Sequence, residues 1–481
     1  MNLKITENKA AKAITALLFI IGCFVIYFYN GTGDTGDSIT HYLYARYAPV
    51  HPELFFHHWA KPLYVLLAVP FAQFGFNGIK FFNLLNATLT LWLTYRLAQK
   101  LILPNPIVAI LILATCSGYF TLTFSGLTEH LFALLLVFSV FLFLTEGYIS
   151  ATIVLSFLPF VRSEGLLMLG IAVLFLIFKR KGQFLPLLAV GHIFYGLAGS
   201  FVHGSVFWIF TKIPYASMGA YASGNFFNFF EKLYYCTGIP QYFLWVIGLV
   251  FVFFRKKYPP HRLNRDFVPQ QYAALFILVY GSFFALFIAH SLFWHFGIFL
   301  TMGLSRVLNA VMPMFALIGL CGFNFIQNML TQQKVKTVVN TLLISYLLVF
   351  PLTSNPAAIK PKKNLMPEND QLVAAQIAEI LKTRFPNHTY YLLHPQLALS
   401  LGLDYFDETK IRDFGKNWQG ALSKNAVLIW DSRFCVIDAG IPLEKVENDP
   451  RLERFGTYQA ENSWQFVVFK VKTTPSVFLT Q

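Results

Sequence analysis

Long apolar runs separated by short polar segments make up most of the chain. Repeated runs of roughly 20 apolar residues predict transmembrane helices. We expect eleven spans, at about residues 11–29, 79–99, 105–124, 127–146, 149–162, 164–178, 184–203, 236–254, 271–290, 305–326 and 336–353. The pattern therefore predicts a polytopic α-helical membrane protein with about eleven transmembrane helices.

One polar stretch interrupts this pattern between the first two spans. Residues 31–61, GTGDTGDSITHYLYARYAPVHPELFFHHWAK, carry acids, imidazoles and cations together. The next apolar run, residues 62–76, is short, and its length suits an interfacial or re-entrant helix better than a full span. A connection between spans needs only a few polar residues, so we expect residues 30–78 to form one long loop that carries the chemistry.

The pattern changes after the last apolar run. Residues 355–368 contain prolines and a basic cluster without periodicity, which is typical of a linker. Residues 369–384 have apolar residues at helical spacing, and residues 390–393, 426–430 and 464–471 are rich in strand-forming residues. We therefore expect a transmembrane domain at 1–354, a linker at 355–368 and a small soluble α/β domain at 369–481.

Composition supports the membrane assignment. The chain is 56% hydrophobic and 12% charged, with a mean hydropathy of +0.55, whereas soluble domains carry about 25% charged residues. The net charge of +14 does not indicate nucleic-acid binding, because the cations flank apolar runs, where they set topology. None of the five cysteines is spaced as a pair, so neither a disulfide framework nor a zinc-finger site is indicated.

The distribution of lysine and arginine orients the spans. If the N-terminus is cytoplasmic and residues 62–76 do not cross, fifteen basic residues face the cytoplasm and seven face outward. The cytoplasmic clusters are Lys4/Lys9/Lys12, Arg96/Lys100, Lys179/Arg180/Lys181, Arg255/Lys256/Lys257 with Arg262/Arg265, and Lys334/Lys336. We therefore predict a multi-pass protein of the plasma (inner) membrane with a cytoplasmic N-terminus and an extracytoplasmic C-terminal domain.

The same topology gathers ionisable residues on the outer side. Such groups are costly at membrane depth and usually face a cavity or a partner. They are Asp34, Asp37, His57, His58, Glu129, Arg162, Glu164, His290, His295 and Arg306. Their convergence on one side predicts a polar cavity in the outer leaflet.

Asp37 has two interpretations. It precedes the amphipathic run SITHYLYARY, so its carboxylate can be an N-terminal helix cap. In a partly buried cavity it can instead be a general base for an incoming hydroxyl. Asp34, three residues earlier, is the alternative base.

The basic residues on this side also have two interpretations. Arg162 can form a structural ion pair with Glu164 or Glu129, or its guanidinium can bind a phosphate. Arg306, at the outer end of an apolar helix, can extend to lipid headgroups or hold the phosphate of a lipid-linked substrate. Glu129 is favoured by the dipole at the start of its helix, or contacts substrate or a metal.

Histidines and aromatic residues complete the candidate set. We expect His290 and His295 to lie in a short outer loop, and Tyr215 and Tyr221 to lie in an interfacial belt or a sugar-stacking loop. The outer histidines and acids permit a divalent metal ion. None of their spacings is specific to a metal site, so we predict no resident metal and leave a substrate-assisting divalent ion open.

The motifs GDTGDSITHYL, HHWAKPLYVLL, SGLTEHLFALLL, VRSEG and HSLFWHFG, followed by Arg306, together resemble the membrane-embedded glycosyltransferases with the GT-C fold. That group includes protein O-mannosyltransferases, oligosaccharyltransferase catalytic subunits and aminoarabinose lipid A transferases. The resemblance covers most of residues 11–353. Ser38 follows Asp37 where O-mannosyltransferases have an adjacent Asp-Glu pair, and the WWD signature of oligosaccharyltransferases is missing from the sequence.

The resemblance implies a polyprenyl-phosphate-linked sugar donor and an acid of the first outer loop, Asp37 or Asp34, as the base. The acceptor would be a hydroxyl of a glycan, a lipid or a protein. Arg306, Arg162 and Lys61 would neutralise the donor phosphate. The expected substrate or metal contacts are His57, His58, Glu129, His290, His295, Tyr215 and Tyr221. A single carboxylate base predicts inversion at the anomeric carbon, because retention needs a second carboxylate as nucleophile.

Two other functions fit parts of the pattern. A transporter or flippase of a lipid-linked sugar or anion would use the same cavity without a base. Transporters often show internal repeats and broken helices at mid-membrane depth, whereas these polar residues crowd one side. A non-enzymatic membrane scaffold with a partner-binding tail leaves the acid-rich loop unexplained.

Overall fold

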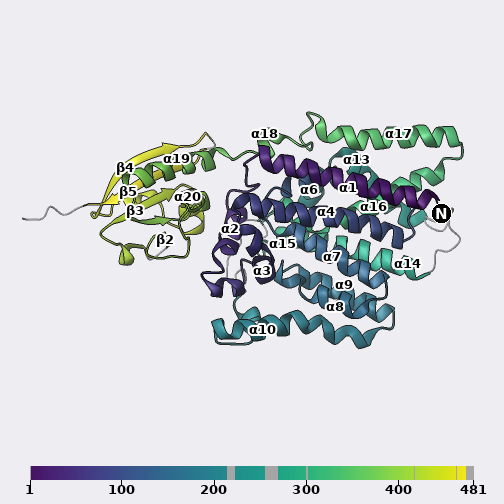
Figure 1. Ribbon diagram of the computed structural model, residues 1–481, viewed down its shortest axis with the longest axis horizontal. Coiled ribbons are helices and arrows are strands. Elements are labelled where there is room, and N and C mark those ends of the chain that lie inside the picture. Colours follow the sequence, from purple (N-terminus) through teal and green to yellow (C-terminus); the bar gives the residue numbers. More distant parts are fainter. Residues whose placement is uncertain are drawn as a thin grey trace, which may run out of the picture.

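The computed structural model describes residues 2–213, 223–254, 269–299, 302–415, 418–461 and 463–472. Its helices form an elongated bundle with a small mixed sheet at one end (Figure 1). The helices of the bundle are α1 (Asn2–Phe28), α4 (Phe76–Lys100), α5 (Ile107–Ala114), α6 (Ser117–Leu122), α7 (Glu129–Leu144), α8 (Tyr148–Ser156), α9 (Gly165–Phe178), α10 (Val190–His203), α11 (Trp208–Thr211), α12 (Asn228–Thr237), α13 (Ile239–Phe254), α14 (Pro269–Ala273), α15 (Gly281–Phe296), α16 (Met312–Met329) and α17 (Gln333–Val349). Between the bundle and the sheet lie α2 (Asp37–Tyr47), η1 (Pro52–Phe56) and α3 (Pro62–Ala72).

Several helices are long and apolar enough to cross a membrane. Within the described ranges there are five, or six if α3 and α4 count as one bent span, and four shorter apolar helices accompany them. The long ones are Thr6–Phe28, Gly182–His203, Gln271–Phe296, Ser305–Met329 and Gln333–Leu352. The chain is therefore a multi-pass membrane protein, but the predicted count of eleven spans is not confirmed.

Broken helices account for part of this difference. The expected span at 105–124 is divided into α5 and α6, because Cys116 takes an extended backbone with φ −66° and ψ 118°. The hydroxyl of Ser117 donates to the carbonyl oxygens of Tyr235 (2.9 Å) and Cys236 (3.3 Å). This contact ties the break to the neighbouring helix α12, so an uninterrupted apolar run in the sequence does not form one straight helix.

The turn between α3 and α4 is sharp. The two helices meet at 120°, and Gly75 has a φ of +77° at the start of α4. A side chain at Gly78 would approach the carbonyl oxygen of Phe71 to 1.9 Å, so only glycine permits this close return. The bend fits a segment 62–76 that does not continue into the next span, although its orientation to the membrane stays a prediction.

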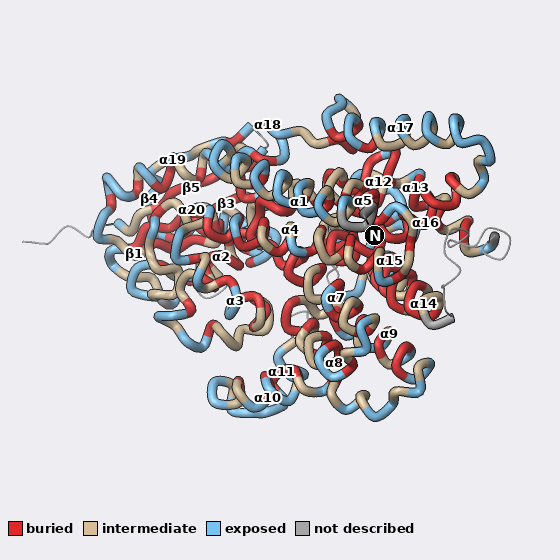
Figure 2. The backbone as a smooth tube through the Cα atoms, turned by 45° about the vertical axis from the view of Figure 1, so that its right-hand side comes forward, coloured by how far each residue is buried: buried red, intermediate tan, exposed pale blue. Residues whose placement is uncertain are grey.

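Burial differs strongly between helices. Helix α16 lies in the centre of the bundle with all of its most apolar window buried, whereas the corresponding windows of α1 and α17 are each only 17% buried. Figure 2 shows α17 at the edge of the bundle with much of its surface exposed. Apolar side chains exposed in this way suit a surface that faces lipid.

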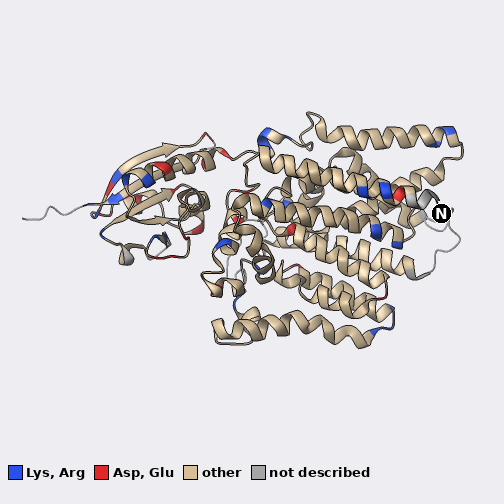
Figure 3. Cartoon of the chain, viewed as in Figure 1, with Lys and Arg blue, Asp and Glu red and all other residues tan. Residues whose placement is uncertain are grey.

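Charged side chains follow the expected membrane pattern. In Figure 3, Lys and Arg (blue) lie mostly near the ends of the helices of the bundle, and the middles of these helices are mostly uncharged (tan). The amide of Gln99, near the end of α4, donates to Asn8 near the start of α1 (3.1 Å). The basic residues beside them, Arg96 and Lys100, therefore share one end of the bundle with Lys9 and Lys12. The predicted cluster at residues 255–265 lies outside the described residues, and which end faces the cytoplasm stays a prediction.

The C-terminal sheet has five strands in the order β2-β1-β3-β5-β4. Strand β1 is parallel to β2 and β3, and β5 is antiparallel to β3 and β4. The elements of this unit are α19 (Asn369–Arg384), β1 (Thr389–Leu392), α20 (Pro395–Leu401), β2 (Ile411–Asp413), β3 (Ala426–Asp431), α21 (Leu443–Glu447), β4 (Leu452–Gln459) and β5 (Gln465–Val471). The expected helix and three strands correspond to α19, β1, β3 and β5, whereas β2 and β4 were not expected.

Candidate active site

The opening loop is held against a second motif far along the sequence. Gly33 has a φ of +76°, and a side chain there would approach the Cβ of Ser125 to 2.6 Å. A side chain at Gly126 would meet the carbonyl oxygen of Ser38 at 2.2 Å. The hydroxyl of Ser38 donates to the carbonyl of Thr32 and accepts from the amide of Gly126, each at 2.6 Å. Glycine at two positions thus lets the GTGDTGDS and SGLTEH motifs pack backbone to backbone.

Asp34 and Asp37 have different roles at the start of α2. The carboxylate of Asp34 accepts the backbone amides of Gly36 (2.7 Å) and Ser38 (3.5 Å). Asp37 is the first residue of α2, and its helix has no side-chain cap hydrogen bond at Gly36. The interpretation of Asp37 as the helix cap is therefore wrong, because Asp34 folds back to meet these amides.

Arg306 joins the two acids. It lies at the start of η5 (Ser305–Val311), and its Nη1 donates to Asp34 Oδ2 at 2.9 Å while its Nη2 pairs with Asp37. Its side chain is only 19% exposed. Arg306 therefore does not extend to lipid headgroups, and the bundle brings a residue of its far half onto the opening loop.

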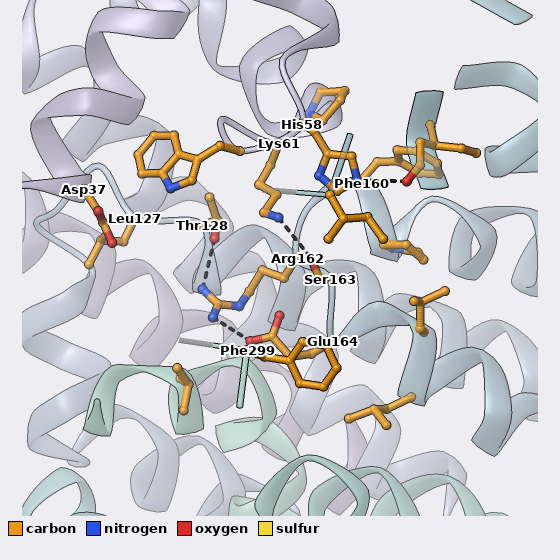
Figure 4. Close-up of a pocket in the computed structure, with 18 of the residues that line it drawn as sticks. Asp37, His58, Lys61, Leu127, Thr128, Phe160, Arg162, Ser163, Glu164 and Phe299 are labelled. Atoms are coloured by element: carbon orange, nitrogen blue, oxygen red, sulfur yellow. Dashed lines mark hydrogen bonds and ion pairs between the residues drawn. The ribbon is translucent and has the colours of Figure 1, made fainter. Parts of the chain in front are cut away.

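A second charged cluster surrounds Arg162. Its guanidinium donates to Glu129 Oε1 at 2.7 Å, to Glu164 Oε1 at 2.8 Å and to Thr128 Oγ1 at 3.2 Å. His290 Nε2 lies 3.1 Å from the same oxygen of Glu164. The predicted structural ion pair is confirmed, and both of the anticipated acids take part in it. Figure 4 shows the links of Arg162 to Thr128 and Glu164.

Lys61 lies beside this cluster in an unusual backbone conformation. Its Nζ donates to Ser163 Oγ at 3.0 Å, and the residue is 7% exposed. Its φ of 68° is rare for a residue with a side chain, and such strain concentrates at functional sites. Burial lowers the pKa of Lys61 to about 8, although the nearby Glu164 carboxylate opposes that shift. Figure 4 shows the ammonium and the Arg162 guanidinium pointing into one space.

These groups line a cavity of about 420 Å³. Its polar lining residues are Asp37, His41, His58, Lys61, Thr128, Arg162, Ser163, Glu164, His290 and Arg306. Its apolar lining residues include Leu166, Leu167, Phe210, Ile213, Phe293, Phe299, Met302 and Leu304. The cavity therefore offers both charged and apolar contacts, which suits an amphiphilic molecule.

Asp37 faces this cavity as a carboxylate. Its side chain is 42% exposed. Burial within the fold would raise the pKa of Asp37, but the charge and hydrogen bond of Arg306 outweigh this effect and hold that pKa below its usual range. Asp34 is not among the described residues that line the cavity. Of the two candidate acids, Asp37 is thus the one placed to meet a molecule there.

The adjacent histidines point in different directions. His58 lines the cavity, with Nε2 3.1 Å from the carbonyl oxygen of Ile209. His57 instead lies 3.3 Å from the hydroxyl of Tyr44. Burial lowers the pKa of each imidazole to about 4, so both are neutral at physiological pH. Only His58 is placed to contact a molecule in the cavity.

Several lining residues were not predicted, among them His41 and Trp59. The rings of His41 and Trp59 stack with centroids 4.8 Å apart and planes 14° apart, and both line the cavity. His41 follows Asp37 by four residues on α2, a spacing that places side chains on the same helix face. That spacing was the available signal for His41. The packing of Trp59 against it depends on the fold of the loop.

The other predicted contacts are divided between the cavity and other parts of the chain. His290 lines the cavity from α15, whereas His295 is exposed and lies 3.3 Å from the carbonyl oxygen of Gly224. The expected short outer loop at HSLFWH is wrong, because α15 continues until Gly297 adopts the left-handed conformation with φ 63°. Tyr215 and Tyr221 lie outside the described residues.

Glu129 is fully buried and contributes to the site through Arg162. Among the residues that the structure describes, no group of three or more His, Cys, Asp or Glu side chains is arranged to hold a metal ion. The charged side chains that line the cavity are the cations Lys61, Arg162 and Arg306 and the carboxylates Asp37 and Glu164.

Comparison with known proteins identifies the fold. No family model matches the chain, and no curated protein sequence matches it. The crystal structure of ArnT from Cupriavidus metallidurans bound to undecaprenyl phosphate is similar, with a TM-score of 0.62 and 11% identity over 96% of this chain and 98% of that chain. The same protein in the apo state gives a TM-score of 0.58 with the same identity and coverage. ArnT is an aminoarabinose lipid A transferase of the GT-C fold. At this identity the likeness establishes architecture, and the chain therefore has the GT-C fold that its motifs led us to expect.

Proposed function

We propose that this protein is a membrane glycosyltransferase. It moves a sugar from a polyprenyl-phosphate donor to a hydroxyl of a glycan, a lipid or a protein on the outer face of the membrane. The observation that carries the proposal is one cavity bordered by the Asp37 carboxylate and by the cations Lys61, Arg162 and Arg306. The solved ArnT structure bound to undecaprenyl phosphate supports the donor class.

The cations suit the leaving group. A polyprenyl phosphate departs with negative charge, which guanidinium and ammonium groups stabilise through charge-assisted hydrogen bonds. Lys61 donates a hydrogen bond to the hydroxyl of Ser163 and also interacts electrostatically with the Glu164 carboxylate. Arg162 and Arg306 are paired with carboxylates. They add positive electrostatic potential to the cavity and orient the carboxylates that they bind. Lys61, whose buried ammonium lines the same cavity, is one of the three proposed phosphate contacts.

Asp37 suits the role of base. A low pKa keeps it ionised, and its exposed side chain can accept the proton of an acceptor hydroxyl as that oxygen attacks the anomeric carbon. The bond to phosphate breaks as the bond to the acceptor forms. Glu164 also lines the cavity, but Arg162 and His290 hold its carboxylate, so we propose that Asp37 alone acts at the reacting carbon and that the displacement inverts the anomeric configuration.

The test is transfer by purified protein from undecaprenyl-phosphate sugars to candidate acceptors, measured by mass spectrometry. Asp37→Asn should lower the transfer rate by about 10²-fold or more, since that is the usual contribution of a general base. Asp34→Asn is the matched control, because it keeps a side chain that can cap α2 outside the cavity; its loss should be much smaller.

Wild-type transfer rates in Asp37→Asn would refute the assignment of the base. A product with the anomeric configuration of the donor, detected by NMR, would refute inversion. Movement of the lipid-linked sugar across vesicles without any product would favour the transporter alternative.

A further inference from the structure

The C-terminal unit touches the loop that carries the two acids. The amide of Gln371, in the first turn of α19, donates to Thr32 Oγ1 at 2.7 Å, and both groups are buried. Glu368, the residue before α19, makes a side-chain hydrogen bond with Thr35. Gly31 also donates its amide to the carbonyl of Leu365 at 2.9 Å. The contacts thus span the whole loop from residue 31 to residue 35.

These contacts continue to the acids through hydrogen bonds. Thr32 Oγ1 accepts from Gln371 and donates to the carbonyl of Asp34 at 2.8 Å. The carbonyl of Thr32 in turn accepts from Ser38, the residue after Asp37. Thr32 is therefore the point at which the C-terminal unit is connected to both sides of the acid pair.

Gln371 is itself held in one rotamer. Its Oε1 accepts the backbone amide of Glu368 at 2.9 Å, and the Glu368 side chain bonds to the backbone amide of Gln371 in return. This reciprocal capping box leaves the Gln371 amide nitrogen directed at Thr32. The helix cap and the loop contact are made by the same side chain.

The far end of α2 is held by the same unit. The hydroxyl of Tyr47 donates to the carbonyl of Leu403 at 2.7 Å, and His51 Nε2 lies 2.9 Å from Asp404 Oδ2. The ring of Phe406 packs edge-on against Tyr44, with centroids 4.9 Å apart. Figure 1 shows α20, which precedes these residues, beside α2. Residues after the bundle thus contact both the loop that precedes α2 and the C-terminal end of that helix.

We propose that Gln371 and Thr32 are positioning residues for the acid pair, so that the C-terminal unit completes the active site. The proposal rests on the proposed function of Asp37. Neither residue touches the cavity. They fix the backbone of residues 32–38, and this backbone decides whether Asp37 faces the cavity and whether Arg306 meets both acids.

The experiment compares kcat and the donor KM in purified full-length protein. Thr32→Val and Gln371→Leu keep the volume and remove the hydrogen bonds, and each should lower kcat by about tenfold or more, since small misplacements of a reacting group carry costs of this order. The donor KM should stay within about twofold, because Lys61 and Arg162 lie outside residues 31–38. Thr32→Ser retains the hydroxyl and should restore most of kcat.

Tyr390→Phe is the matched control. It removes a buried hydrogen bond of the same unit, from the Tyr390 hydroxyl to the carbonyl of Phe385 at 2.7 Å, at the other end of α19. Its kcat should equal that of the wild type. A loss of kcat in Tyr390→Phe as large as in Gln371→Leu would show general destabilisation and overturn the proposal. Wild-type kcat in both Thr32→Val and Gln371→Leu would also overturn it.

Amide hydrogen exchange separates this proposal from the proposed function. Thr32→Val and Gln371→Leu should speed exchange in residues 32–40, whereas Tyr390→Phe should leave it unchanged. If the wild type transfers no sugar, the proposed function fails and exchange still tests the positioning. If amide exchange in residues 32–40 is unchanged in both Thr32→Val and Gln371→Leu, the positioning role of these residues is overturned even in an active enzyme.

Discussion

The buried ammonium of Lys61 makes the pH dependence of donor use a direct test of its assigned role. Burial lowers the pKa of Lys61 from 10.5 to about 8. At pH 7 about nine in ten molecules then carry the charge, and at pH 9 about one in ten does. If the ammonium binds the donor phosphate, kcat/KM for the donor should fall roughly tenfold between these two pH values, because kcat/KM reports the free enzyme.

The change that checks this reasoning is Lys61→Arg. A guanidinium stays charged throughout this range, so the fall above pH 8 should disappear, even if the maximal rate is lower. The assay is the initial rate at donor concentrations well below KM, from pH 6 to pH 9.5, in detergent micelles. A pH profile of the wild type that stays flat to pH 9.5, or an identical fall in Lys61→Arg, would refute the assignment.

The same pKa has a consequence for stability. The folded protein holds the proton of Lys61 less tightly than the unfolded chain does, because the pKa is lower in the folded state. Between about pH 8 and pH 10.5 the unfolded chain therefore binds more protons, and the contribution of Lys61 to stability rises with pH across this window. As the pH rises over this range, donor binding should weaken, whereas the contribution of Lys61 to folding stability should increase.

Two further substitutions test the packing of the site. Gly126→Ala places a methyl group 2.2 Å from the carbonyl oxygen of Ser38, which should destabilise the protein by about 1–3 kcal/mol and displace the opening loop; Gly170→Ala, in helix α9 with nothing within 4 Å of its Cβ position, should be neutral or stabilising in the same thermal unfolding assay. Arg162→Met leaves the carboxylate of Glu129 buried without its partner, which should cost about 3–5 kcal/mol. The double variant with Glu129→Gln should recover part of that loss, and equal unfolding temperatures for the single and double variants would contradict the pairing.

The apolar pattern predicted much of the architecture because its cause is local. A helix that crosses lipid must satisfy its own backbone hydrogen bonds and present apolar side chains, and both requirements are visible in a window of about 20 residues. The strand-like runs at 390–393, 426–430 and 464–471 were visible for a similar reason. The exact number of spans was not, because the break at Cys116 depends on a hydrogen bond from Ser117 to a helix more than a hundred residues later.

Part of the candidate site was also predictable. Charge distribution placed Asp37, Lys61, Arg162 and Arg306 on one side of the membrane, and the four do line one cavity. The different positions of Asp34 and Asp37 were not predictable from the sequence. Both acids directly follow a glycine in the same short loop. Only the fold shows which carboxylate accepts the backbone amides and which faces the cavity.

By itself, the sequence determined that this chain is a multi-pass helical membrane protein with a polar, acid-bearing opening loop and a small C-terminal α/β unit. The tertiary structure decided the pairings: Arg306 with both acids, Arg162 with Glu129 and Glu164, and Gln371 with Thr32. Hydropathy and charge are local properties of a window of about 20 residues, so they can be read directly along the chain. Ion pairs and hydrogen bonds act over about 3 Å in space, and only folding brings residues 272 or 339 positions apart to that distance.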